Sequence, residues 1–455
     1  MRHRHGLFLL VAAALVAATA APLVSPLQAQ DPAPVKVESF TLTNGLRVHL
    51  VEDHSAQVVA VNVWYDVGSR NERAGRTGFA HLFEHMMFQG SANVGKMEHG
   101  QLVERAGGAY NGSTNPDRTN YYQVVPSNRL NLALWLEADR MRSLAITPDN
   151  LENQRQAVKE ERRLRVDNQP YTGALVDSLP LLWDANGCFA YAHSIIGSMN
   201  DLDAASVEDV ADFFRTYYSP SNATLVVVGD ATMPQLMRLA QQYFGNIPAG
   251  PRPDPVTCDA PPGAGAPRVH RVSDANATLP AVITVVRAVP PAHADYPALA
   301  LLSTILGTGE SSKLNRSMVR GSRSAVAAQA LHDPFGPMRA SGVFGALVIA
   351  NAGVSEDSLT RELGRELFAL ADAISTEELE KAKNTWRSNT IFERQRAEAL
   401  AEGIHFAAMY LGGPEALNTE AARYAAVTVA DLQRVARTYL RPERSLTLLI
   451  TPEAR

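Results

Sequence analysis

Apolar and polar positions along this chain follow two recurring patterns. Short, nearly continuous apolar runs, such as residues 58–65 and 281–286, predict buried strands. Longer segments in which apolar residues recur every three or four positions, such as residues 207–217, predict amphipathic helices between the strands. Strands separated by long helices predict a fold of the α+β or α/β class.

One combination of helix, turn and strand occurs twice, at a constant offset of 222 residues, in residues 207–225 and 429–447. Each copy contains a helix that ends in Arg-Thr-Tyr, then a proline and an apolar strand. Residues 147–152 and 375–380 form a second related pair, and both begin like a helix with an N-capping residue. Solenoid repeats span only about 20–50 residues, so a repeat of this length indicates a duplicated domain.

A segment rich in proline and glycine separates the two copies. Residues 248–267 contain seven prolines, which predict an extended, semi-rigid linker without regular structure. We therefore expect an N-terminal domain at residues 30–247 and a homologous C-terminal domain at residues 268–455.

The first residues have the pattern of a targeting segment. Arg2 and Arg4 precede an apolar run at residues 7–21, which is shorter than the roughly 20 residues that a membrane span needs. A signal peptide at residues 1–29, cleaved after Ala29, fits this pattern. Cleavage near Ala20 and an uncleaved anchor are the alternatives. We expect an exported, periplasmic protein with no membrane span after removal of the signal.

Composition excludes several classes of protein. The chain is 46% hydrophobic and 20% charged, as in folded proteins and unlike disordered chains, collagens or coiled coils. With 42 Lys and Arg against 47 Asp and Glu, it lacks the basic surface that nucleic acids require. The only two cysteines, Cys188 and Cys258, allow one disulfide or two free thiols, but no thiolate metal cluster.

The most specific chemical signal is the pentapeptide from His81 to His85, His-Leu-Phe-Glu-His. On a helix these two histidines are four residues apart, so both imidazoles can reach one metal ion. Glu84 is well placed to take a proton from metal-bound water. The pattern is among the known zinc-peptidase signatures, although it can also arise by chance.

A catalytic zinc site needs a third protein ligand, and the charged helical segment at residues 153–163 offers candidates. At 100° per residue, Glu161 lies on the side of Gln154 and close to the apolar line through Leu151, whereas Glu160 points the opposite way. We expect Glu161 to face inward as the ligand. The alternative is that it belongs to a solvated helix face.

Together, His81, Glu84, His85 and Glu161 resemble the inverted-zincin metallopeptidases typified by pitrilysin and mitochondrial processing peptidase, in their short two-domain form. The spacing from His85 to Glu161 matches this family closely. Further matching segments lie along the chain: residues 107–114, 119–122, 196–197, 218–222, 228–230 and 377–383.

The resemblance implies an α+β fold with two homologous α/β-roll domains that enclose a chamber. It implies a zinc endopeptidase for unfolded or short polypeptides, in which His81, His85 and Glu161 bind one zinc ion and Glu84 is the general base. The segment Asn111, Gly112, Ser113 and Thr114 would be an edge strand that adds the substrate as a further strand. Without the family, Asn111-Gly112 is typical of a hairpin turn.

The C-terminal half departs from a complete site. At the repeat offsets, Ser303, Leu306, Gly307 and Asn389 stand where the first half has its four site residues. The resemblance implies a substrate-binding Arg, here Arg320, but the Tyr expected after it is absent between residues 321 and 345.

These gaps suggest a homologous partner subunit without the zinc motif, and a homodimer is the alternative. A different function would be that of a non-catalytic zinc-binding or structural subunit.

Gln154 is a further departure from the family. It replaces an acidic residue that many relatives have beside the metal, which could loosen the orientation of the ligands.

Overall fold

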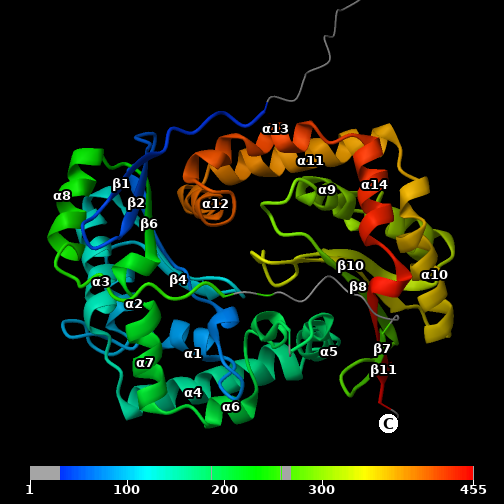
Figure 1. Ribbon diagram of the computed structural model, residues 1–455, viewed down its shortest axis with the longest axis horizontal. Coiled ribbons are helices and arrows are strands. Elements are labelled where there is room, and N and C mark those ends of the chain that lie inside the picture. Colours follow the sequence, from blue (N-terminus) through cyan, green and yellow to red (C-terminus); the bar gives the residue numbers. More distant parts are fainter. Residues whose placement is uncertain (1–30, 186, 257, 259–267, 454–455) are drawn as a thin grey trace, which may run out of the picture. The chain divides into compact units, whose positions relative to one another are not determined.

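Two β-sheets, one from each half of the sequence, form the framework of the protein (Figure 1). The computed structural model describes residues 31–185, 187–256, 258 and 268–453. The first sheet has six strands in the order β1-β2-β6-β3-β5-β4, and the second has five in the order β7-β11-β8-β10-β9. The strands of the first sheet are β1 (Glu38–Thr41), β2 (Arg47–Glu52), β3 (Val58–Tyr65), β4 (Ala109–Thr114), β5 (Thr119–Pro126) and β6 (Ala223–Gly229). Those of the second are β7 (Arg268–Asp274), β8 (Ala281–Ala288), β9 (Ala325–His332), β10 (Gly342–Ala350) and β11 (Ser445–Pro452).

The duplication is visible in the topology of the sheets. Strands β2-β6-β3-β5-β4 of the first sheet correspond in order to β7-β11-β8-β10-β9 of the second. In each sheet one pair is parallel, β2 with β6 and β7 with β11, and the following pairs are antiparallel. The predicted α+β class with two related halves is therefore confirmed.

Helices cover the sheets in both halves. The first half contains α1 (Phe79–Met86), α2 (Glu98–Arg105), α3 (Leu130–Ser143), α4 (Pro148–Arg162), α5 (Thr172–Ser178), α6 (Met199–Asp203), α7 (Val207–Tyr217) and α8 (Met233–Phe244). The second half contains α9 (Tyr296–Gly307), α10 (Glu356–Phe368), α11 (Thr376–Arg394), α12 (Ala397–Tyr410), α13 (Glu420–Ala425) and α14 (Val429–Tyr439). The caps expected at Thr147 and Ser375 are present, since their hydroxyls accept the amide protons of Asn150 and Glu378.

One helix of the second half packs on the sheet of the first. Helix α12 lies beside β6 (Figure 1). Its residues Leu400 and Ile404 lie in an apolar cluster with Val226 and Val228 of β6. A polar contact lies beside this cluster, where Glu402 Oε1 accepts a hydrogen bond of 2.6 Å from Asn62 Nδ2. The residues from Pro32 onward accordingly form one compact unit.

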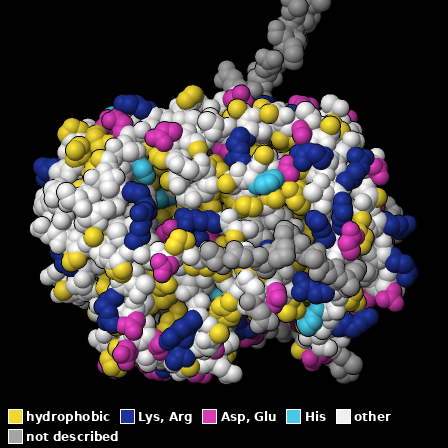
Figure 2. Space-filling view, in the orientation of Figure 1, with side chains coloured by type: hydrophobic (Ala, Val, Ile, Leu, Met, Phe, Trp, Pro, Cys, Tyr) yellow, Lys and Arg dark blue, Asp and Glu magenta, His cyan; other side chains and the backbone are white. Residues whose placement is uncertain are grey.

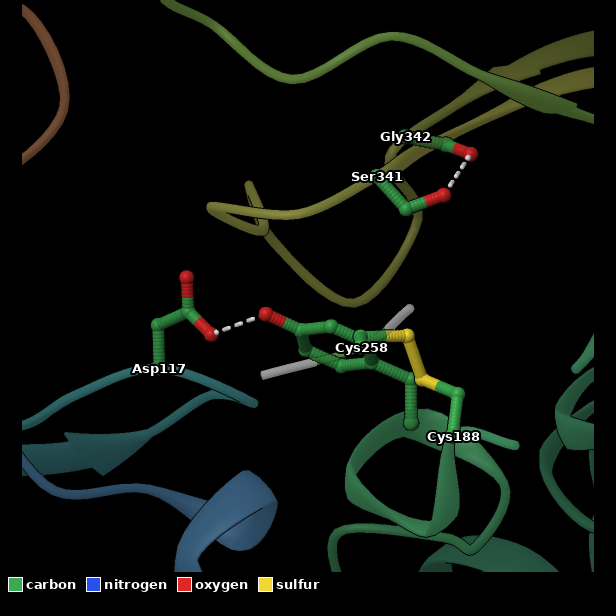
Figure 3. The surroundings of a disulfide bond; sticks show 6 residues. Asp117, Cys188, Cys258, Ser341 and Gly342 are labelled. Carbon is green, nitrogen blue, oxygen red and sulfur yellow. Dashed lines mark hydrogen bonds between the residues drawn. A yellow bond between two sulfur atoms is a disulfide. The ribbon is translucent and has the colours of Figure 1, made fainter. Parts of the chain in front are cut away.

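A disulfide joins Cys188 to Cys258 across 70 residues of sequence, with 4.7 Å between the two Cα atoms (Figure 3). It settles the choice between a disulfide and two free thiols that the sequence leaves open. The segment around Cys188 is also held by a hydrogen bond, since Tyr191 donates its hydroxyl to Asp117 Oδ1 over 2.9 Å. The disulfide therefore ties the segment around Cys188 to the segment that connects the two halves.

Several sequence expectations fall outside the described part of the chain. The expected signal peptide at residues 1–29 lies outside it, as do residues 257 and 259–267 of the expected linker. The domain boundaries stay predictions. Within the described residues, no helix combines the length and the apolar character needed to cross a bilayer. Figure 2 shows basic and acidic side chains interspersed over the face drawn.

Candidate metal centre

The helix that carries the pentapeptide, α1, is anchored at its first residues. The buried carboxylate of Glu72 accepts hydrogen bonds from the amides of Gly78 and Ala80, at 2.8 and 2.7 Å, and so satisfies donors that a helix N-terminus leaves free. Gly78 has a φ of +85°, and a Cβ there would lie 2.6 Å from the Ile196 carbonyl oxygen. This position therefore requires glycine, and the start of α1 is fixed against neighbouring backbone.

The structure brings His81, His85 and Glu161 together at the contact between α1 and α4. One ligand atom from each residue lies within 4.8 Å of the other two. Glu161 Oε2 is 3.6 Å from His81 Nε2 and 3.1 Å from His85 Nε2. Two imidazoles and one carboxylate are a donor set of catalytic zinc sites, which keep a fourth position open. Within the described residues, no other group of three such side chains converges in this way.

The electrostatics of the cluster suit a cation. Burial, followed by the neighbouring His85, lowers the pKa of His81 to about 4, so its imidazole is neutral. The hydrogen bond with His85 is the largest cause that lowers the pKa of Glu161, which keeps the carboxylate ionised. Metal binding requires a free electron pair on each ligand atom. Burial lowers the pKa of His85, but the hydrogen bond and the charge of Glu161 outweigh burial and raise this pKa overall, so a metal ion competes with a proton at His85. The residues present therefore fit a divalent metal such as zinc.

Glu160 and Glu161 occupy different environments. The Glu161 side chain is 18% exposed and lies against the histidines, whereas the Glu160 side chain is 56% exposed and pairs with Arg163. The inward direction expected for Glu161 from helical periodicity matches this arrangement. On its other side, Glu161 Oε1 forms an ion pair with Arg165 Nη1 at 2.8 Å.

Glu84 lies beside the cluster without belonging to it. Its side chain is largely buried, and this burial raises the pKa of its carboxyl group. The hydroxyl of Thr114 donates a hydrogen bond of 2.6 Å to Glu84 Oε2. A partly buried carboxylate beside three side chains that could hold a metal ion is placed where a general base could act.

The segment from Asn111 to Thr114 forms part of β4, the outermost strand of the first sheet. Asn111-Gly112 lies within the strand and not in a hairpin turn. The Gly112 amide donates to Asn111 Oδ1 over 2.9 Å, and a Cβ at Gly112 would lie 3.3 Å from Glu84 Cγ. The edge that can accept a further strand therefore runs directly past Glu84.

A cavity of about 1030 Å³ opens in front of these residues. Both halves of the chain contribute to its wall, and much of the wall is apolar. Its lining includes Phe88, Met97 and Trp183 from the first half and Phe335, Met338 and Val343 from the second. An extended peptide with apolar side chains fits such a surface.

Arg320 lies elsewhere. It belongs to the π-helical segment η7 (Asn315–Gly321), is 57% exposed and forms an ion pair with Glu310. It is not among the described residues that line the cavity. Leu306, which replaces Glu84 at the repeat offset, is fully buried in the core of the second half.

Sequence reasoning missed two contributors to the site. The role of Arg165 could have been found, because it follows Glu161 by four residues on a helical segment. The role of Glu72 had no local signal, since its carboxylate reaches the amides of Gly78 and Ala80 only after the chain has turned.

Known proteins resemble this chain in sequence and in structure. The family described as Insulinase (Peptidase family M16) matches residues 47–179, and the one described as Peptidase M16 inactive domain matches residues 204–385. Zinc protease PqqE of Helicobacter pylori is 31% identical over 422 residues, which cover 92% of this chain and 93% of that protein. The beta subunit of the mitochondrial-processing peptidase of Dictyostelium discoideum is 25% identical over 93% of this chain and 91% of its own length. The crystal structure of a protease from Helicobacter pylori has a TM-score of 0.85 at 30% identity, and covers 92% of this chain and 100% of that one.

Proposed function

Because this chain belongs to the insulinase family of peptidases, peptidase family M16, we propose that it is a zinc-dependent endopeptidase for unfolded or short polypeptides. The observation that carries the proposal is the convergence of His81, His85 and Glu161 beside the separate, partly buried carboxylate of Glu84. His81, His85 and Glu161 would hold one zinc ion per chain.

The chemistry follows from the chain's own residues. When bound, zinc lowers the pKa of water and polarises a carbonyl oxygen. The backbone of β4 holds the peptide as an added strand, which brings one peptide bond in front of Glu84. Glu84 takes a proton from the attacking water as the water oxygen bonds to the carbonyl carbon. Glu84 then delivers this proton to the nitrogen as the C–N bond breaks, so no covalent enzyme intermediate forms.

The alternative is a non-catalytic zinc-binding or structural subunit. A scaffold would need the three metal donors but would have no need of Glu84, which is not one of the three converging side chains. The family description with the words "inactive domain" matches residues 204–385, outside the part of the chain that contains His81, Glu84, His85 and Glu161. These two points favour the enzyme.

Cleavage of an unfolded protein by the wild type, by Glu84→Gln and by Glu160→Gln tests the proposal. We expect one zinc per chain in all three proteins, activity that a chelator abolishes, and a loss of about 100-fold or more in kcat for Glu84→Gln alone. Glu160→Gln is the matched control, since it makes the same change at an exposed carboxylate of α4. Wild-type turnover by zinc-loaded Glu84→Gln would refute the catalytic role.

We further propose export to the periplasm after removal of residues 1–29, and assembly with a homologous subunit that lacks the zinc motif. The basic and apolar pattern of the first residues supports export, and the incomplete second half supports a partner. One relative bears the name of a subunit, the beta subunit of a mitochondrial-processing peptidase. Cell fractionation and N-terminal sequencing of the mature protein test the export.

A further inference from the structure

The hydroxyl of Thr114 makes a direct contact with Glu84 that strand addition to β4 does not require. Thr114 Oγ1 donates to Glu84 Oε2 over 2.6 Å, between the last residue of the edge strand and the helix that carries the metal donors. We propose that Thr114 is a positioning residue, whose hydroxyl holds Glu84 in the orientation needed to take the proton. This inference rests on the proposed peptidase function.

The geometry of β4 gives the contact its direction. Successive side chains of a strand point to opposite faces, so positions 112 and 114 face α1 together, while Ser113 faces away and donates to Asn120 Oδ1. A Cβ at Gly112 would lie 3.3 Å from Glu84 Cγ. Gly112 therefore leaves room for the stem of Glu84 beside the strand, and Thr114 donates a hydrogen bond to one of its carboxylate oxygens.

The hydroxyl itself has little freedom. Thr114 pairs with Thr119 of β5 in the sheet, and the amide of the next residue, Asn115, donates to the Arg118 carbonyl over 3.0 Å. A β-branched side chain on a paired strand is restricted at χ1, so the backbone largely determines where Oγ1 lies. The donor is thus placed by the sheet and not by a mobile surface side chain.

This contact divides the two oxygens of Glu84 between two roles. An ionised carboxylate can only accept, and the hydrogen bond from Thr114 occupies one acceptor position of Oε2. We infer that Oε1 is the atom turned toward the water whose proton Glu84 takes. A catalytic group has to be held to within about 0.5 Å of its productive position, and a partly buried hydrogen bond from a paired strand provides such a restraint. The strand that binds the peptide would therefore also orient the base that attacks it.

Thr114→Val and Thr114→Ser separate this role from substrate binding. Valine keeps the shape and the backbone pairing but removes the donor, and serine restores the donor. We expect kcat to fall about 10- to 100-fold in Thr114→Val, with KM changed less than about twofold, and to return to within about threefold of wild type in Thr114→Ser. Thr41→Val is the matched control, because Thr41 is exposed on β1 at the opposite edge of the same sheet.

Two measurements that do not depend on turnover complete the test. Zinc content and melting temperature should be unchanged in Thr114→Val. In a Glu84→Gln background, calorimetry with an unfolded peptide should give the same affinity with and without the Thr114→Val substitution. Wild-type kcat in Thr114→Val, a rise in KM alone, or a serine variant as impaired as the valine variant would overturn the inference. If Glu84→Gln itself kept full activity, the proposed function would fail instead.

Discussion

Arg165 Nη1 lies 2.8 Å from Glu161 Oε1, while the other carboxylate oxygen of Glu161 faces the two histidines. The two residues are four positions apart, where α4 continues into the π-helical segment η3 (Arg163–Asp167). Arg165, whose side chain is 78% exposed, thus pairs with one oxygen of Glu161, while Oε2 is directed at the histidines. Partners of this kind orient metal ligands in many proteins.

The first prediction concerns the third metal ligand. Glu161→Gln should lose most of its zinc, because a neutral amide is a weak replacement for a carboxylate in this donor set. Glu160→Gln should keep one zinc per chain, since its side chain is 56% exposed and pairs with Arg163. Metal analysis after dialysis against a weak chelator distinguishes the two. Zinc loss from Glu160→Gln in place of Glu161→Gln would show that the wrong carboxylate has been chosen.

The second prediction is a pH dependence of stability that arises from Asp333. Burial raises the pKa of Asp333 to about 7, and the charge of Asp117 adds to this rise. Hydrogen bonds from the Val343 amide and the Tyr296 hydroxyl lower the pKa but do not outweigh burial. Between about pH 4 and 7 the unfolded chain releases a proton that the folded protein keeps. The free energy of unfolding should therefore fall as the pH rises through this range.

The Asp333→Asn variant should lack this fall. The free energy of unfolding of Asp333→Asn minus that of the wild type should therefore increase between pH 4 and pH 7.5. The increase should be up to about 4 kcal/mol, since the pKa of Asp333 is shifted by roughly three units. Guanidinium unfolding of the metal-free proteins at several pH values measures the difference and avoids interference from zinc. An identical difference at all pH values would contradict the assignment to Asp333.

Local periodicity explains why the sequence predicted that His81, His85 and Glu161 would lie close together. The spacing of His81 and His85 and the angular difference between Glu160 and Glu161 follow from 100° per residue, which any α-helix imposes. The duplication was visible because two copies of the same helix and strand have kept their spacing of 222 residues, at 207–225 and 429–447. The family resemblance, which is confirmed, rests on the motif from His81 to His85, its spacing to Glu161 and the further matching segments along the chain.

Contacts between distant segments were beyond such reasoning. The bond from Thr114 to Glu84 spans 30 residues and depends on how α1 packs against the edge of the sheet. The placement of Asp333 at the cavity wall depends on how the second half meets the first. The local sequence pattern around Thr114 or Asp333 does not indicate which distant residue each one contacts. Only the folded structure shows these contacts.

The third prediction concerns the disulfide. Replacing Cys188 and Cys258 with serine opens a loop of 70 residues, so the free energy of unfolding should fall by about 4 kcal/mol. Guanidinium unfolding under oxidising conditions measures the loss. A reductant should lower the stability of the wild type to that of the double variant and should leave the variant unchanged. A wild type that is unaffected by the reductant would show that the cross-link contributes little.

The last prediction is that this chain needs a partner for full activity. Arg320, the substrate-binding Arg that the family resemblance implies, is exposed, pairs with Glu310 and is not among the described residues of the cavity wall. The Tyr expected to follow it is absent between residues 321 and 345. The second half therefore does not supply these contacts to the site of its own chain, and a homologous subunit could supply them.

Mixing experiments test this prediction. The purified chain should cleave an unfolded protein slowly, and a homologous subunit without the zinc motif should raise kcat/KM about 10-fold or more and form a complex of twice the mass in solution. Glu84→Gln in this chain should abolish the activity of the mixture, because the added subunit has no general base to replace the one that is lost. Full activity of the chain as a monomer or homodimer, unchanged by the added subunit, would refute the prediction and leave its own two halves sufficient for catalysis.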